Sequence, residues 1–245
     1  MKKRLLSLLL MLAPTLALSA AGGVHLDKAN IDPDNQQSLQ RGARLFVNYC
    51  LSCHAAALMR YERMGHDLGI SEPVVAENLM FTGGRVGELM TVATDPEDAI
   101  EWFGTVPPDL SVIARSRGVD WLYSYLRSFY KDGSRVTGVN NLVFPDVGMP
   151  FALWELQGWQ KPIITTVRDP DGTERKVVEI ELEEPGLLSP KEYDRAVRDL
   201  VNFLDYMAEP GKHERRALGV KVIMFLLVFL VVAYLMKKEF WKDVH

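Results

Sequence analysis

Cysteine is scarce in this chain, which has only Cys50 and Cys53 among 245 residues. Two cysteines cannot form the network of crosslinks that holds a small secreted disulfide scaffold. An excess of positive charge is also missing, because 28 Lys and Arg face 32 Asp and Glu for a formal net charge of -4. We therefore predict no nucleic-acid partner. Internal repeats and low-complexity tracts are absent too, which favours one domain with appended segments.

Long apolar runs occur only near the two ends. The first four residues are basic apart from Met1, residues 5–18 are apolar with one break at Pro14, and residues 19–21 are small. This pattern is typical of a secretory signal peptide over residues 1–21, with an uncleaved membrane anchor as the alternative. We therefore expect residues 22–211 to form a domain that is exported from the cytoplasm.

The second apolar run, residues 217–236, contains a single charge at Lys221. A helix of about 20 residues spans roughly 30 Å, which matches the hydrocarbon thickness of a bilayer. A buried core helix is the alternative, but the run is apolar on every side of the helix. We predict a transmembrane helix over residues 217–236, a short polar hinge over 212–216, and a basic, aromatic cytoplasmic tail over 237–245.

Both cysteines belong to one motif, Cys50-Leu51-Ser52-Cys53-His54. Cys-x-x-Cys-His is the attachment pattern of a c-type haem, in which two thiols bind the vinyl groups and the histidine ligates the iron. A disulfide, a dithiol redox pair and a zinc site are the alternatives, and zinc would need further ligands. The histidine directly after the second cysteine favours one covalently bound haem c.

A second axial ligand decides whether a haem iron is open to substrates or restricted to electron transfer. Met149 lies in a Gly-Met-Pro turn of an aperiodic loop, about a hundred residues after the motif. Most other methionines lie in apolar or helical patterns, where methionine usually fills a core. Met149 is therefore the favoured ligand, while the other methionines and the remaining histidines stay open as alternatives. Those histidines are His25, His66, His213 and His245.

Most of the exported region has helical periodicity. We expect one helix from Ser38 into the motif, one capped by Asp120 with an aromatic face reaching Tyr130, and one after the capping box that begins at Ser189. Residues 163–167 and 174–182 read as two strands joined by a turn at 169–172. The predicted fold class is mostly α, with a small β-hairpin and one C-terminal transmembrane helix.

The chain resembles the cytochrome c1 family in several blocks, in the same order and over nearly the whole exported region. The first block is Arg41-Gly42-Ala43, Asn48-Tyr49, the Cys-x-x-Cys-His motif and Arg60-Tyr61; the others are residues 77–81, Pro107-Pro108-Asp109-Leu110-Ser111 with Arg115 and Arg117, residues 144–158, and the C-terminal span. The likeness is greatest to proteobacterial members. It implies a cytochrome c-like haem domain.

The resemblance also implies roles around the haem: thioether attachment for Cys50 and Cys53, proximal and distal iron ligation for His54 and Met149, packing against the haem for Pro108, and pairing with a haem propionate for Arg117. Arg115 is the alternative for the last role. No family feature aligns with the hairpin around residues 163–182. Several members carry a further disulfide, for which this chain has no cysteine left.

For function, the resemblance implies a subunit of the quinol–cytochrome c oxidoreductase, or cytochrome bc1, complex. The chain would accept single electrons from the Rieske iron–sulfur protein and reduce a soluble or tethered cytochrome c. Quinol chemistry would belong to other subunits, so we expect no catalytic residue here. The expected partners are cytochrome b, the Rieske protein, cytochrome c and membrane lipid, in a dimeric complex of the bacterial inner membrane with the haem domain in the periplasm.

Two alternatives remain from the sequence. One is a membrane-anchored cytochrome c that feeds a terminal oxidase. The other is a haem enzyme, such as a peroxidase, with an open iron position.

Overall fold

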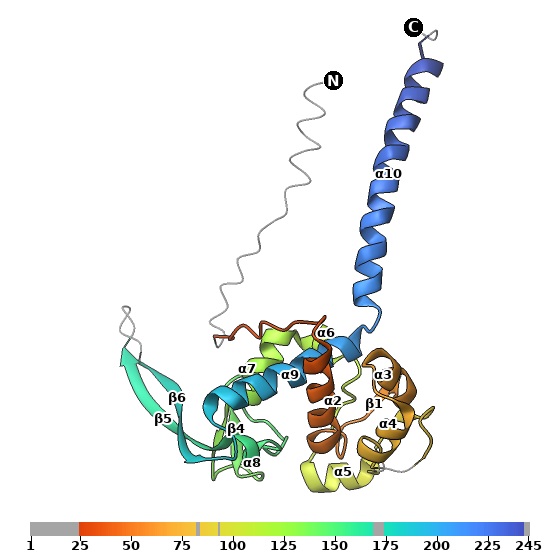
Figure 1. Cartoon of the computed structure of the whole chain (residues 1–245). Helices are drawn as coiled ribbons and strands as arrows, with labels where there is room; N and C mark the ends of the chain where they lie inside the picture. The colour runs from red at the N-terminus through yellow and green to blue at the C-terminus, as the bar shows by residue number, and fades with distance from the viewer. Residues whose placement is uncertain (1–24, 82–83, 93, 169–173, 243–245) are drawn as a thin grey trace.

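The computed structural model describes residues 25–81, 84–92, 94–168 and 174–242 (Figure 1). The predicted signal peptide, the turn at 169–172 and the end of the tail lie outside the described residues. The helices are α2 (Gln36–Tyr49), α3 (Tyr61–Asp67), α4 (Glu72–Asn78), α5 (Pro96–Phe103), α6 (Ile113–Arg117), α7 (Val119–Arg127), α8 (Trp154–Gln157), α9 (Pro190–Ala208) and α10 (Lys212–Phe240). The strands are β1 (Ala56–Arg60), β2 (Leu89–Met90), β3 (Phe129–Lys131), β4 (Val139–Asn141), β5 (Gly158–Arg168) and β6 (Glu174–Pro185).

A mostly helical body carries two projections, the hairpin β5–β6 and the helix α10 (Figure 1). The strands pair antiparallel as β1–β2, β3–β4 and β5–β6. The predicted class, mostly α with a small hairpin and one C-terminal apolar helix, is confirmed.

The centre of the body is the contact between α2 and α9. At Gly42, a Cβ atom would lie 2.1 Å from the carbonyl oxygen of Asp199 and 2.6 Å from the Cβ atom of Phe203, so only glycine permits this approach. The Asp199 carboxylate accepts hydrogen bonds from Ser38 Oγ (2.6 Å) and from Arg41 Nε and Nη2 (2.6 and 3.1 Å). Because α2 leads directly into the Cys-x-x-Cys-His motif, this contact fixes the position of the motif relative to α9.

Helix starts follow local capping chemistry. The side chain of Asn35 accepts from Ser38 N (3.0 Å), so α2 begins at Gln36, two residues before the predicted start at Ser38. The capping box of Ser189 and Glu192 opens α9, as predicted.

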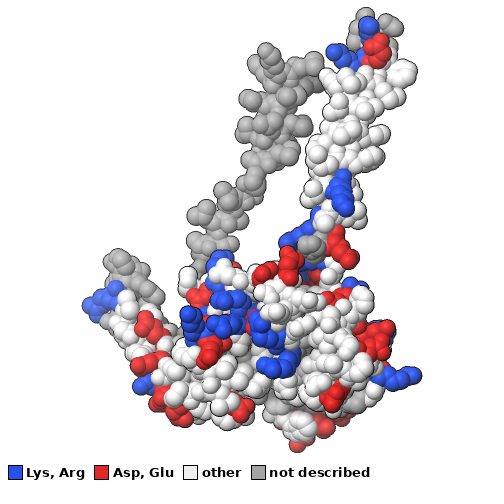
Figure 2. All heavy atoms as spheres, viewed as in Figure 1, with Lys and Arg blue, Asp and Glu red and all other residues white. Residues whose placement is uncertain are grey.

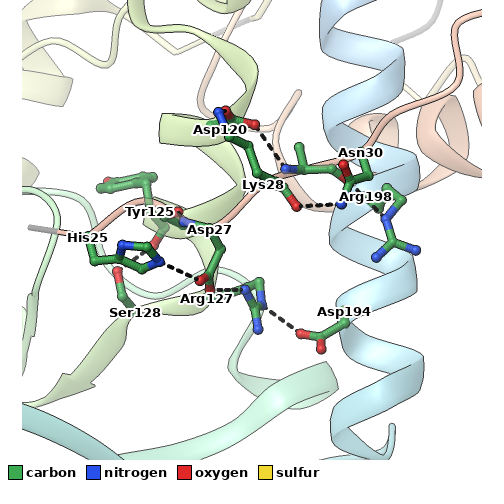
Figure 3. Close-up of polar contacts among 12 residues, drawn as sticks. His25, Asp27, Lys28, Asn30, Asp120, Tyr125, Arg127, Ser128, Asp194 and Arg198 are labelled. Carbon is green, nitrogen blue, oxygen red and sulfur yellow. Dashed lines mark hydrogen bonds and ion pairs between the residues drawn. The ribbon is translucent and has the colours of Figure 1, made fainter.

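Asp120 does not cap α7, because that helix begins one residue earlier, after Gly118. Its carboxylate instead accepts from Ala29 N (2.9 Å) and Lys28 Nζ (2.7 Å) of the segment that precedes α2. The same segment is held by Arg127, which donates to Asp27 (2.6 Å) (Figure 3). Asp120 therefore makes a tertiary contact instead of capping the helix.

The predicted aromatic helix face reaching Tyr130 ends early, at Arg127, and Phe129 and Tyr130 lie in β3. The carbonyl groups at this helix end are bound by distant side chains. Asn141 Nδ2 donates to Tyr125 O (2.8 Å), and Gln160 Nε2 donates to the carbonyls of Arg127 (3.0 Å) and Phe129 (2.8 Å). These bonds stabilise the turn into β3.

The hairpin β5–β6 is longer than its two predicted strands. Its residues pair from Gly158 with Pro185 to Arg168 with Glu174. Its base is fixed to the body by Lys131, which binds Glu183 (2.9 Å) and Glu184 (2.5 Å). Farther out, its side chains are mostly exposed, including Ile164 at 61%.

α10 is long and apolar enough to cross a membrane over residues 214–240, and none of its most apolar stretch is buried. Figure 2 shows few charged side chains along it between its two ends. Residues 212–216, predicted as a hinge, are helical; the break between α9 and α10 is Glu209-Pro210-Gly211 instead. Lys212 binds Asp205 (2.8 Å) across this break.

Candidate haem-binding site

One cavity of about 340 Å³ is lined by all six of the predicted haem-contact residues, Cys50, Cys53, His54, Pro108, Arg117 and Met149. They come from the end of α2, the loop before α6, the end of α6 and the loop between β4 and α8. The rest of the wall is mainly apolar and comes from α6, α7, α9 and neighbouring loops; it includes Val106, Ile113, Leu122, Leu126, Val147, Leu200 and Leu204. Apolar walls with a few convergent polar groups are typical of cofactor pockets.

The two thiols are presented by a tight turn at the end of α2. The amides of Cys53 and His54 both donate to Cys50 O (3.1 and 2.8 Å). Both cysteines are free, so no disulfide joins them. Burial raises the pKa of the Cys50 thiol to about 12, whereas a dithiol redox centre needs a lowered thiol pKa.

A zinc site finds no support either. In the part of the chain that the structure describes, no three His, Cys, Asp or Glu residues gather as metal ligands. The haem interpretation of the motif is therefore the one that its surroundings favour.

The imidazole of His54 is oriented by the carbonyl oxygen of Pro108, which lies 2.7 Å from Nδ1. A carbonyl can only accept, so Nδ1 carries the proton and Nε2 keeps a free lone pair. Burial also lowers the pKa of His54, which favours the neutral ring. A neutral imidazole held through Nδ1 in this way is the usual form of a metal-ligating histidine.

Asp109 fixes the loop that carries Pro108, and sequence reasoning missed this role. Its carboxylate accepts from Ala57 N (2.8 Å) and Ser111 N (2.8 Å), and Leu110 N donates to Ala55 O (2.8 Å). The loop is thereby joined to the chain just after His54. The sequence Pro107-Pro108-Asp109-Leu110-Ser111 could have indicated part of this role. An aspartate side chain commonly accepts a hydrogen bond from the backbone amide two residues later.

Met149 lies half-buried in a loop that is aperiodic but not loose. Asn141 Oδ1 accepts from the amides of Val143 (2.9 Å) and Phe144 (3.1 Å), and Asn140 Oδ1 accepts from Asp146 N (2.9 Å). The two asparagines thus replace secondary structure as the support of this loop. The sulfur of Met149 accepts a hydrogen bond from the hydroxyl of Tyr125 at 3.3 Å, a contact that the sequence did not predict.

Arg117 lies at the cavity with its guanidinium over two aromatic rings. Its Cζ atom is 5.1 Å from the ring centroid of Trp121 and 5.7 Å from that of Phe144. Such stacking holds an arginine in place while its N–H groups remain available. Arg115, the alternative for the propionate, is not among the residues that line the cavity.

These residues fit a covalently attached haem. The two free thiols, the neutral imidazole with a free Nε2 and the thioether of Met149 form the donor set of a His/Met-ligated c-type haem, and they meet in one apolar cavity. Fold and site together define a c-type cytochrome. Among such proteins, the profile described as the Cytochrome C1 family matches residues 29–155 and 187–244, and the chain belongs to that family.

Individual relatives agree with this assignment. The chain is 49% identical to cytochrome c1 of Allochromatium vinosum over 245 residues, covering 100% of both proteins. It is 49% identical over 242 residues to a Nitrosomonas europaea protein named ammonia monooxygenase gamma subunit, covering 99% of this chain and 98% of that one. It is 26% identical to cytochrome c1 of Rhodospirillum rubrum over 260 residues, covering 91% and 90%.

Membership of this family makes the chain a c-type cytochrome of the bc1 complex, with haem c as cofactor and with cytochrome b and the Rieske protein as fellow subunits. The family profile leaves residues 156–186 unmatched. Both strands of the hairpin β5–β6 lie in that stretch.

Proposed function

We propose that this chain passes single electrons from the Rieske iron–sulfur protein to cytochrome c, using one covalently bound haem c. The bound haem supplies the one-electron couple. The observation that carries the proposal is the meeting of His54 and Met149 in one apolar cavity. A histidine and a thioether together leave no iron position for a substrate, which favours electron transfer over oxygen or peroxide chemistry.

Each residue then has a defined task. Cys50 and Cys53 would hold the haem by thioether bonds, and His54, whose ring is held by the carbonyl of Pro108, would ligate the iron through Nε2. The soft thioether of Met149 would favour the reduced iron and so raise the reduction potential. Arg117 offers a positive charge to a propionate. No residue of this chain acts on quinol.

We place this domain, residues 22–211, in the periplasm, with residues 217–236 in the bacterial inner membrane and residues 237–245 in the cytoplasm. The signal pattern over residues 1–21 and the exposed apolar surface of α10 support this orientation. We also propose that the complex is dimeric, on the strength of the family resemblance.

We place the docking surface for the electron acceptor beside the cavity, at α5. Residues Glu97, Asp98 and Glu101 of α5 are exposed, and Trp102 on the same helix is 59% exposed. Phe103, the last residue of α5, lines the cavity together with Thr105 and Val106, which follow the helix. Acidic side chains beside an exposed apolar surface would attract a cationic cytochrome c and hold it near the haem.

The first test is composition. Gentle detergent purification through a C-terminal tag should recover cytochrome b and the Rieske protein together with quinol-dependent reduction of cytochrome c. Recovery of the haem protein without cytochrome b would instead support a membrane-anchored carrier that feeds a terminal oxidase.

The second test is ligation. Met149→His should keep a low-spin spectrum with a much lower potential, because imidazole favours the oxidised iron more than a thioether does. Met149→Ala should open the iron and change the spectrum. Met64→Leu is the matched control, since Met64 is fully buried in the core and does not line the cavity. Unchanged spectrum and potential in Met149→Ala would rule out Met149 as the ligand.

A further inference from the structure

We propose that Tyr125 is a positioning residue for Met149, and that its hydroxyl, by donating a hydrogen bond to the thioether sulfur, raises the reduction potential of the haem. The inference rests on the proposed function, because it requires Met149 to be an iron ligand. No feature of the sequence singled out Tyr125 from the other aromatic residues of its helix.

The contact itself is direct. Tyr125 Oη lies 3.3 Å from Met149 Sδ, and both residues line the cavity. Tyr125 is only 9% exposed, and its phenolic hydroxyl is a hydrogen-bond donor. A thioether sulfur has two lone pairs. One can bind iron while the other accepts from Tyr125, so the two interactions are compatible.

The ring of Tyr125 is fixed by its aromatic neighbours. It stacks on Trp121, with ring centroids 4.9 Å apart and an interplanar angle of 10°. Phe129 meets it edge-on at 5.1 Å and 67°, and Phe129 in turn stacks on Phe151 at 4.9 Å and 10°. Aromatic pairs of this kind add roughly 0.5–1.5 kcal/mol each beyond burial. Because Oη is attached to the ring, it can move away from the sulfur only if the ring moves, and that would disturb these contacts.

The backbone of Tyr125 is joined to the same loop that carries Met149. Its carbonyl accepts from Asn141 Nδ2 at 2.8 Å, and Asn141 Oδ1 supports the amides of Val143 and Phe144. Tyr125 is therefore hydrogen-bonded to this segment at two points. Its carbonyl binds Asn141 at the start of the loop, and its hydroxyl binds Met149. Two connections from one residue hold the sulfur in a defined place before any iron binds it.

The electronic consequence follows from the direction of the hydrogen bond. A donor to the sulfur withdraws electron density from it, which weakens its bond to electron-poor ferric iron more than its bond to ferrous iron. The reduced state gains relative to the oxidised state. Tyr125 thus acts on the potential through Met149, without touching the iron.

The test is Tyr125→Phe in the intact, haem-loaded complex. We expect the red absorption band of a methionine-ligated ferric haem to persist but shift. We also expect the equilibrium constant for reduction to fall about threefold to tenfold, which is about 30–60 mV at 59 mV per tenfold for one electron. Tyr123→Phe is the matched control, because Tyr123 is a buried tyrosine of the same helix that does not line the cavity.

A second variant should shift the reduction potential in the opposite direction. 3-Fluorotyrosine at position 125 keeps the ring shape and makes the hydroxyl a stronger donor, so the potential should rise. This variant also serves if Tyr125→Phe loses haem through poor folding.

The outcomes separate the two proposals. A wild-type protein that lacks the methionine band, together with an unchanged spectrum in Met149→Ala, contradicts the ligand assignment and hence the proposed function. A wild-type protein that shows the band, with potentials of Tyr125→Phe and the fluorinated protein equal to that of Tyr123→Phe, refutes the role of Tyr125 alone. Haem content, measured for every variant, excludes a difference in loading.

Discussion

Asp67 shows how one carboxylate joins elements far apart in the chain. It lies at the end of α3 and accepts from Arg63 Nε (2.5 Å) and from the hydroxyl of Tyr206 on α9 (2.9 Å). Burial alone would raise the pKa of Asp67, but the hydrogen bonds from Arg63, Tyr206 and His66 outweigh burial and lower it. The ionised form of Asp67 is therefore favoured by folding.

This shift predicts an acid-sensitive contribution to stability. Because the folded pKa lies below the unfolded value of about 4, the contribution is complete at higher pH and disappears as pH falls through the folded pKa. Asp67→Asn should lower the free energy of unfolding by about 1 kcal/mol at neutral pH and by much less in acid. Thermal unfolding at a series of pH values measures the difference. Glu77→Gln, at an exposed position on α4, is the control, and a pH-independent effect of Asp67→Asn would contradict the assignment.

The residues that carry the chemistry of the site were the part of it that the sequence predicted best. The motif at Cys50 to His54 and the braced turn at Met149 have spacings that only a few chemistries explain. The bond of Asp109 to Ala57 and the role of Tyr125 were missed because they depend on atoms brought close by folding. For Tyr125, the hydrogen-bond partner is 24 positions away in the chain.

Element boundaries were predicted less well, for a related reason. The spacing of aromatic residues suggested that the helix continues to Tyr130, since local periodicity cannot show that Asn141 and Gln160 bind the carbonyls at its end. The hairpin gave a clear local signal, and its existence was predicted correctly. Its length was underestimated mainly at the base, because residues 158–162 and 183–185 show no regular alternation of polar and apolar side chains.

The hairpin β5–β6 is separable from the haem site. The residues that line the cavity stop at Ala152 and resume at Leu200, so none belongs to the hairpin. Replacing residues 162–180 by Asn-Gly, the favoured two-residue hairpin turn, would keep the Lys161–Glu181 pair and the anchored base. We expect unchanged haem attachment and an unchanged potential, with the thermal midpoint altered by only a few degrees.

Haem staining, redox titration and calorimetry check this expectation. The matched control is Gln160→Ala, which removes the bonds to Arg127 and Phe129 at the hairpin base and should destabilise the domain. Loss of haem in the shortened hairpin would mean that the outer strands support the site from a distance.

At the scale of the whole molecule, the haem domain and α10 are connected by residues 209–211 and, among the described side chains, by ion pairs. Lys212 binds Asp205, and Arg215 binds Glu209 at 2.6 Å. Asp205 is only 7% exposed, so its pair with Lys212 is better shielded from solvent than a surface pair. This joint gives the domain a preferred orientation relative to α10.

Ending the chain after Gly211 should release a water-soluble haem domain. Among the described residues, none beyond Leu204 lines the cavity, so the absorption spectrum and the potential should match those of the full chain in detergent. Solubility without detergent and redox titration are the measurements. A shifted potential in the shortened protein would mean that α10 or its membrane contributes to the field at the haem.

The order in which the cavity-lining residues occur along the chain also bears on when the haem site closes. The attachment motif precedes Met149 by about 95 residues, and the α9 residues Leu200 and Leu204 come later still. If the chain is exported from its N-terminus, as we propose, its two thiols would leave the translocation channel before the opposite wall does. A haem attached at that stage would meet an open half-site, and the later segments would then close over it.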